Sequence, residues 1–109
     1  TKYMPTLGDP ETRKAIADKL VKENHIPTTA DHIAISAGGK YSLFVACQCL
    51  FDFPAPGQPQ QEAILPVPAW VSYVPMIEIA GGRVVELQTD ASGDFKITPE
   101  QLRKALNPN

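Results

Sequence analysis

The hydrophobic positions of this chain recur at two spacings, one typical of helices and one typical of strands. Residues 9–24 have the helical spacing. The apolar positions expected on the buried side of this segment are Ile16, Ala17, Leu20 and Val21. Asp9 and Pro10 are typical of a helix start, because a carboxylate accepts the first N–H groups and proline fits the first helical position. The pattern therefore predicts a first helix over residues 9–24.

Three short apolar segments predict strands, and helical stretches separate them. The predicted strands are residues 32–36 (HIAIS), 62–66 (EAILP) and 83–88 (RVVELQ). The later predicted helices are residues 39–51, 69–82 and 98–106. The first of these three is apolar enough to be buried on most sides. Strands that alternate with helices indicate parallel pairing, so we expect an α/β fold with three short strands and about four helices.

Local signals place the ends of these helices. Pro75 lies in the middle of the predicted helix 69–82, so we expect that helix to kink or to start late. Thr98 and Gln101 have the spacing of a capping box around Pro99, which predicts where the last helix begins.

Composition and charge narrow the function classes. The chain has 109 residues, 43% hydrophobic and 20% charged, which fits at most one globular domain. No apolar run approaches the ~18 residues of a membrane span. The net charge of −2, with basic residues dispersed among acidic ones, argues against nucleic-acid binding. The chain begins at Thr1 without an initiator methionine or signal-peptide pattern, so we expect a piece of a longer protein.

The cysteines and histidines predict no metal site. Cys47 and Cys49 are two positions apart on a predicted helix, so they point to nearly opposite sides and cannot easily form a disulfide or share a metal. We therefore expect reduced, mostly buried thiols in a cytoplasmic protein. His25 and His32 have no acidic or thiol partner at metal-ligand spacing.

The segment 36–41, SAGGKY, joins a predicted strand to a predicted helix and contains two successive glycines. Glycine lets backbone amides approach an anion, and the helix that follows directs N–H groups and its positive dipole end to the same place. The spacing is neither that of a P-loop nor that of the dinucleotide-binding fingerprint. From these residues alone, the segment is either a plain tight turn or a seat for a phosphate.

Three longer segments resemble one enzyme family. "KYMPTLGDPETRKAIADKL" resembles the Y-x-x-x-x-G-x-P-E-L-R-x-A-I-A segment of class I pyridoxal-phosphate-dependent aminotransferases, particularly the aspartate aminotransferase group. "ISAGGKYSLF" is similar to the family's V-T-x-G-G-K-Q-A-L-F, and "LPVPAWVSYVPMIEIAGGRVVEL" to its P-x-P-x-W-V-S-Y-x-x-M-x-x-L-A-G-G. The resemblance covers nearly all of residues 1–109. It implies a partial pyridoxal-phosphate-binding large domain of three-layer α/β/α architecture.

The resemblance implies a phosphate end of the cofactor site. By matching position, Gly38, Gly39 and Lys40, in the turn 36–41, would hold the phosphate of pyridoxal 5'-phosphate. Tyr3 matches a tyrosine that reaches across a dimer interface to the neighbouring subunit's phosphate, so the resemblance also implies a homodimer. A phenol hydroxyl is a suitable donor for this role.

The resemblance also implies an aromatic wall for the cofactor ring. Trp70, in the segment 66–73, matches the aromatic residue that stacks on the pyridine ring. Such a wall orients the ring, which acts as an electron sink, and excludes water. Tyr73 is a second residue expected beneath the ring. The alternative interpretation of Trp70 is a core tryptophan at a helix start.

Several parts of the family pattern are absent or altered. Leucine is expected where Thr12 stands, and Gln-Ala where Tyr41 and Ser42 stand. None of the ten lysines and arginines matches the family's cofactor-binding lysine or its carboxylate-binding arginine. Asn107 and Asn109 do not reproduce the family's S-x-N-N-P-T-G segment. We therefore expect a portion of an aminotransferase that acts on an amino acid, aspartate or similar, and a 2-oxo acid, and that is inactive alone.

Two further interpretations stay open from the residues, a non-catalytic phosphate- or cofactor-binding module and a dimerisation fragment. The resemblance also bears on pairing of the strands. In the family's seven-stranded sheet, the strand like 32–36 is not adjacent to those like 62–66 and 83–88. Strand edges would then lie open, which predicts self-association of the chain.

Overall fold

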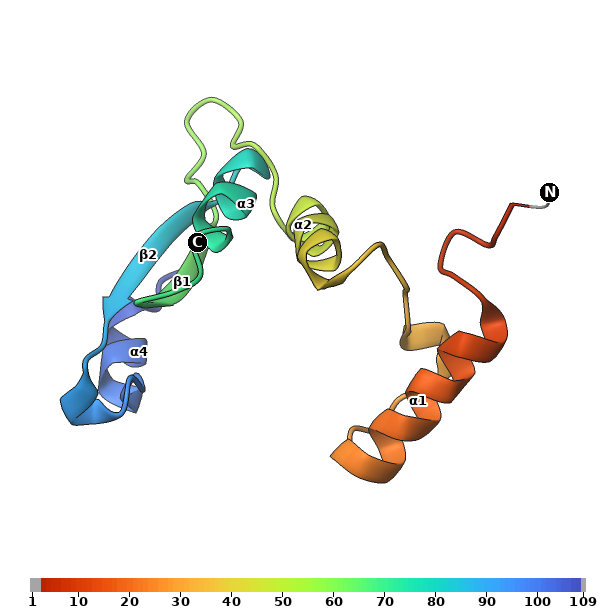
Figure 1. Ribbon diagram of the computed structural model, residues 1–109. Helices are drawn as coiled ribbons and strands as arrows, with labels where there is room; N and C mark the ends of the chain where they lie inside the picture. The colour runs from red at the N-terminus through yellow and green to blue at the C-terminus, as the bar shows by residue number, and fades with distance from the viewer. Residues whose placement is uncertain (1–2, 109) are drawn as a thin grey trace. The chain divides into compact units, whose positions relative to one another are not determined.

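The computed structural model of the chain describes residues 3–108 and divides into two units, residues 1–42 and residues 43–109 (Figure 1). The residues outside this range are Thr1, Lys2 and Asn109. The structure therefore does not test what the sequence analysis said of Asn109. Each unit has its own packing contacts.

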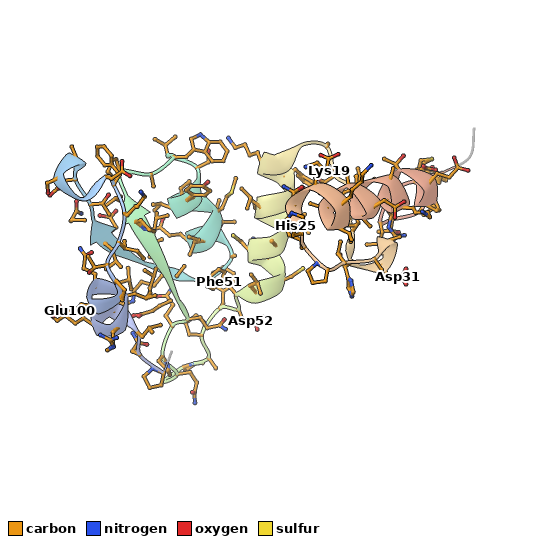
Figure 2. All side chains as sticks on the ribbon, turned by 90° about the horizontal axis from the view of Figure 1, so that it is seen from below. Lys19, His25, Asp31, Phe51, Asp52 and Glu100 are labelled. Carbon is orange, nitrogen blue, oxygen red and sulfur yellow. The ribbon has the colours of Figure 1, made fainter. Side chains whose placement is uncertain are left out.

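The first unit is built on helix α1, Pro10–Asn24, which confirms the first predicted helix. The Asp9 carboxylate accepts the backbone N–H of Thr12 at 2.8 Å and its hydroxyl at 2.7 Å. The Thr12 N–H, with the Thr12 hydroxyl second, holds the pKa of the Asp9 carboxyl below its ordinary value. At the other end, His25 adopts the left-handed conformation and donates its N–H to the Leu20 carbonyl (Figure 2).

Helix α1 packs against the short 3₁₀ helix η1, Ala30–His32, and the extended segment that follows it. Arg13 makes this contact, because its Nε donates to the Ile33 carbonyl at 2.8 Å and its Nη2 to the Ala30 carbonyl at 2.6 Å. Ala17 is the buried residue of α1. The half-buried guanidinium of Arg13 therefore joins α1 to η1 in a unit that has a small apolar core.

The predicted strand 32–36 is wrong as a member of a sheet. Ile33–Ser36 is extended, and Ile35 donates one N–H to the Leu7 carbonyl at 2.9 Å, but no strand ladder forms there among residues 3–108. A strand exists only through repeated bonds to a neighbour. The two strands of the described chain pair with each other in the second unit. The apolar alternation of 32–36 does not show which segment could pair with it, and His32 belongs to η1.

The second unit is a parallel βαβ arrangement. Strand β1, Glu62–Val67, and strand β2, Arg83–Gln88, pair in register from Glu62 opposite Arg83 to Val67 opposite Gln88. Helix α3, Tyr73–Ile79, connects them and packs on β2. The buried apolar residues of this unit are Met76, Ile77 and Ala80. The two other predicted strands and the parallel α/β pairing are thus confirmed.

The ends of the helices in this unit follow local chemistry. Helix α3 begins only two residues before Pro75, which confirms the late start, since the first turn has no use for the missing proline N–H. Helix α4 spans Pro99–Ala105. Its capping box is present, with Thr98 Oγ accepting the Gln101 N–H at 3.1 Å and Gln101 Oε1 accepting the Thr98 N–H at 2.8 Å.

Helix α2, Gly39–Leu50, is present but is not buried as predicted. None of its residues is buried, Cys47 is half-buried and Cys49 is exposed. The reason is that no other helix or strand of the described chain packs extensively on α2, and burial needs a covering element. The expectation of mostly buried thiols is therefore wrong for Cys49. Within residues 3–108, no helix has both the length and the apolar character to cross a membrane.

Candidate functional site

The glycine turn lies at the start of α2. Gly38 has φ of +104°, a conformation that favours glycine, and Gly39 is the first residue of the helix. A Cβ added at either glycine would meet no protein atom within 4 Å. The space in front of both residues is therefore open to a ligand that approaches the backbone.

Hydrogen bonds fix this turn from within the first unit. The Gly38 carbonyl accepts the N–H groups of Tyr41 and Ser42, both at 3.1 Å. It also accepts the Ser36 hydroxyl at 3.0 Å, and the Ser36 and Ser42 oxygens are 2.6 Å apart. Sequence reasoning gave Ser36 and Ser42 no role. The only signal in the sequence is that two serines flank the glycines, and this does not show which groups their hydroxyls bond.

The turn fits a phosphate group. The first N–H groups of an α-helix have no acceptor within the helix, and the aligned peptide dipoles favour a negative charge at this end. Lys40, an exposed residue of the first helical turn, adds a positive charge. Open space, backbone donors and a cation are the elements of an anion site. Gly38, Gly39 and Lys40, for which the resemblance implies phosphate binding, are consecutive residues of this turn.

Trp70 lies in the segment between β1 and α3, after the cis Val67–Pro68 peptide bond. Its ring and that of Tyr73 meet at a right angle, with centroids 5.5 Å apart. Trp70 is 44% exposed, so a planar ligand has access to the indole. Sequence analysis placed Tyr73 beneath the cofactor ring, and the structure places it against Trp70. Both belong to the second unit, whereas the glycine turn belongs to the first.

Tyr3 belongs to the first unit, before α1, and is fully exposed. The structure does not bring it into any helix or strand. Its predicted role depends on a neighbouring subunit and stays a prediction.

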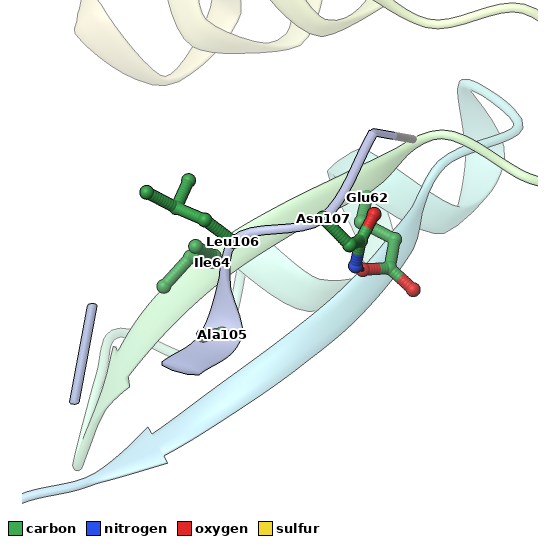
Figure 3. A pocket seen from close by; sticks show the side chains of 5 residues that line it. All are labelled: Glu62, Ile64, Ala105, Leu106 and Asn107. Atoms are coloured by element: carbon green, nitrogen blue, oxygen red, sulfur yellow. Dashed lines mark hydrogen bonds between the residues drawn. The ribbon is translucent and has the colours of Figure 1, made fainter. Parts of the chain in front are cut away.

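Two hollows occur elsewhere in the second unit. One, of about 60 Å³, lies between β1 and the end of α4, where Glu62 pairs with Arg83 and accepts the Asn107 amide (Figure 3). The other hollow, of about 210 Å³, is lined in part by Asp90. The Ser92 hydroxyl lowers the pKa of the Asp90 carboxyl from its ordinary value, and the N–H groups of Gly93 and Ser92 lower it further. The carboxylates in both hollows already have partners. Among residues 3–108 there is no group of three His, Cys, Asp or Glu residues that could hold a metal ion.

Comparison with known proteins identifies the family. The family model "Aminotransferase class I and II" matches residues 1–109. The chain is 40% identical over 108 residues to aspartate/prephenate aminotransferase of Thermus thermophilus, an alignment that covers 99% of the chain and 26% of that enzyme. It is 34% identical over 106 residues to aspartate aminotransferase of Bacillus subtilis, over 97% of the chain and 25% of that enzyme. The chain therefore belongs to the class I and II aminotransferase family.

Solved structures agree with this assignment. The fold is similar to aspartate aminotransferase from Thermus thermophilus with maleate, with a TM-score of 0.89, 40% identity and coverage of 99% of this chain and 27% of that chain. It is also similar to the aromatic aminotransferase from Pyrococcus horikoshii, with a TM-score of 0.82, 33% identity and coverage of 98% and 27%. The chain spans about a quarter of the length of these relatives.

Proposed function

We propose that this chain is the phosphate- and ring-binding portion of a pyridoxal-phosphate-dependent aminotransferase. The whole enzyme would exchange an amino group between an amino acid, aspartate or similar, and a 2-oxo acid. The single observation that carries the proposal is the open glycine turn at the start of α2, with backbone donors, a positive φ at Gly38 and no atom within 4 Å of an added Cβ. Family membership and the printed activities of the relatives support the choice of cofactor and substrates.

Each residue proposed to bind the cofactor contacts one part of it. The Gly38 and Gly39 backbone and the Lys40 side chain neutralise and orient the phosphate. Trp70 offers a flat apolar surface for the pyridine ring and excludes water from one side of it. The bound cofactor supplies the electron sink that this chemistry needs. Tyr3 of one copy would donate its hydroxyl to the phosphate held by another copy.

The proposal gives this chain no catalytic residue. No lysine here stands in a segment that resembles the family's cofactor-binding lysine, so we expect the 109 residues alone to catalyse no amino transfer. A coupled assay with aspartate and a 2-oxo acid tests this, and turnover by the purified chain would contradict it. The alternatives of a non-catalytic binding module and a dimerisation fragment differ in cofactor binding, which the next experiment measures.

Substitution of Gly39 by alanine separates the fold from the proposed site. The new Cβ meets nothing within 4 Å beyond the helix's own backbone and its chain neighbours, and alanine is a good helix former, so α2 should persist. The same Cβ would enter the space assigned to the phosphate. We expect pyridoxal phosphate to quench the fluorescence of Trp70, the one tryptophan, saturably in the parent chain, and at least ~10-fold more weakly in Gly39→Ala, a loss of about 1.4 kcal/mol.

The controls identify the group that is recognised. Pyridoxal without phosphate should quench without saturation, and borohydride trapping detects random lysine adducts. Gly93→Ala is the matched variant, because an added Cβ there also meets nothing within 4 Å, and it should leave the affinity unchanged. Equal affinities of the Gly39→Ala and parent chains would contradict a phosphate seat at this turn.

Self-association is the remaining part of the proposal. The outer edges of β1 and β2 have no strand partner among the described residues, and large apolar side chains such as Leu50, Phe53 and Val71 are exposed. Open strand edges and apolar surface favour association, so we expect a dimer or larger species by light scattering. A monomeric species that unfolds cooperatively would contradict this. The proposed cytoplasmic location rests on the two free cysteines, and cell fractionation tests it.

A further inference from the structure

Two serine hydroxyls form a directed chain of hydrogen bonds to the Gly38 carbonyl. Ser36 Oγ donates to that carbonyl at 3.0 Å, which uses its only proton. The contact of 2.6 Å between Ser36 Oγ and Ser42 Oγ can be donated by either hydroxyl, and Ser42 donates it when Ser36 gives its proton to the carbonyl. Ser42 Oγ lies 3.5 Å from the Gly38 carbonyl, too far for a comparable direct bond. We assign the proton order Ser42 to Ser36 to Gly38, because Ser36 is the nearer of the two hydroxyls to the carbonyl.

The Gly38 carbonyl has three donors, and its direction is fixed. Besides Ser36, it accepts the N–H groups of Tyr41 and Ser42, so it points along α2. A trans peptide is planar, with its carbonyl and its N–H on opposite sides. The Gly39 N–H belongs to the same peptide unit and must point away from the helix, beyond its N-terminal end. At this end of the helix, a Cβ added at Gly38 or at Gly39 also meets nothing within 4 Å.

We propose that Ser36 and Ser42 are positioning residues that aim the Gly39 N–H at the phosphate of the cofactor. The inference rests on the proposed function, because it assumes a phosphate at this turn. Neither hydroxyl needs to touch the anion. Glycine on both sides of this peptide leaves the backbone free to rotate, so a restraint from side chains lowers the entropy that phosphate binding would otherwise cost. Each bond in a hydroxyl chain also polarises the next, so the loss of Ser42 weakens the bond of Ser36.

The test is a titration of the ¹⁵N-labelled chain with inorganic phosphate and with pyridoxal phosphate, followed by the amide resonance of Gly39. We expect saturable shifts in the parent chain and about two- to tenfold weaker binding in Ser36→Ala and in Ser42→Ala, the effect of one net hydrogen bond. Ser42→Thr keeps the hydroxyl and should restore binding. Helix content should not fall in any variant, because the backbone bonds of α2 stay intact.

A double variant distinguishes positioning from direct contact. If Ser42 acts through Ser36, Ser36→Ala/Ser42→Ala loses little more affinity than Ser36→Ala alone. Ser92→Ala, which removes a hydroxyl bonded to Asp90 at 2.5 Å in the other unit, is the matched control and should leave the affinity unchanged.

Each contrary result has its own meaning. Additive losses in the double variant would place both hydroxyls on the anion and overturn positioning. Full affinity in the single variants, or no rescue by Ser42→Thr, would overturn the inference while the phosphate site stands. No response of Gly39 in the parent chain to either ligand would overturn the proposed function as well.

Discussion

Substitution of Gly81 by alanine is expected to unfold the βαβ unit. Gly81 has φ of +94°, and an added Cβ would lie 2.7 Å from the Phe53 nitrogen and 2.8 Å from the carbonyl carbon and oxygen of Asp52. These are backbone atoms, which cannot turn away as a flexible side chain can. The Gly81 N–H donates to Glu78 at 3.0 Å and its carbonyl accepts from Gln60 at 3.0 Å, so the backbone of Gly81 cannot shift without losing bonds.

The free energy that Gly81→Ala is expected to cost is large relative to the total stability of the unit. Left-handed strain costs about 1–3 kcal/mol and overpacking about 1–3 kcal/mol more. A unit of this size has a total stability of roughly 3–10 kcal/mol. We expect Gly81→Ala to abolish protection of the β1 and β2 amides against hydrogen exchange, including the Arg83 N–H that donates to Gln61 at 2.8 Å.

Gly57 provides the matched control. Gly57 also has a positive φ, +81°, but an added Cβ meets nothing within 4 Å. Gly57→Ala should therefore lose only the strain part, about 1 kcal/mol, and keep the sheet. Equal losses in both variants would mean that the chain at Asp52, which Figure 2 labels, and at Phe53 does not pack on Gly81 in solution.

Features that depend on neighbouring residues were predicted from the sequence. Asp9 before Pro10 gave the start of α1, and Thr98 with Gln101 gave the start of α4, because a cap is satisfied within one helical turn. The glycine turn was predicted for the same reason. The position of the turn follows from two glycines between an apolar segment and a helical one, without any distant contact.

Features that depend on distant partners could not be predicted in this way. The apolar alternation of 32–36 does not say which segment pairs with it, and an apolar helix such as α2 does not name what covers it. The roles of Ser36 and Ser42 needed the geometry of the turn, since six positions separate them. Arg13 belongs to the family pattern, but the sequence analysis gave it no role. The signal that was missed is a charged residue on the same side of the helix as Ile16 and Ala17, where its guanidinium needs hydrogen-bond partners.

Substitution of Arg13 by methionine is expected to destabilise the first unit. The Arg13 side chain is 12% exposed, and its bonds to the carbonyls of Ala30 and Ile33 are 2.6 and 2.8 Å long. Methionine keeps the length of the side chain and removes the donors, so two part-buried carbonyls lose their charged partner. We expect a loss of about 2–4 kcal/mol, because a hydrogen bond to a charged group contributes about 1.5–3 kcal/mol. The exposed Asp31, 3.7 Å away, adds little.

Hydrogen exchange of the Ile35 N–H, which donates to Leu7 at 2.9 Å, measures this loss within the first unit. Lys14→Met is the control on the adjacent position, since Lys14 is 71% exposed and its pair with Asp18 contributes at most about 0.5 kcal/mol. A similar loss of stability in both variants would contradict a stabilising role for the bonds of Arg13 to the Ala30 and Ile33 carbonyls. Because Arg13 anchors the segment that leads to Ser36, Arg13→Met should also weaken phosphate binding at Gly39, whereas Lys14→Met should not.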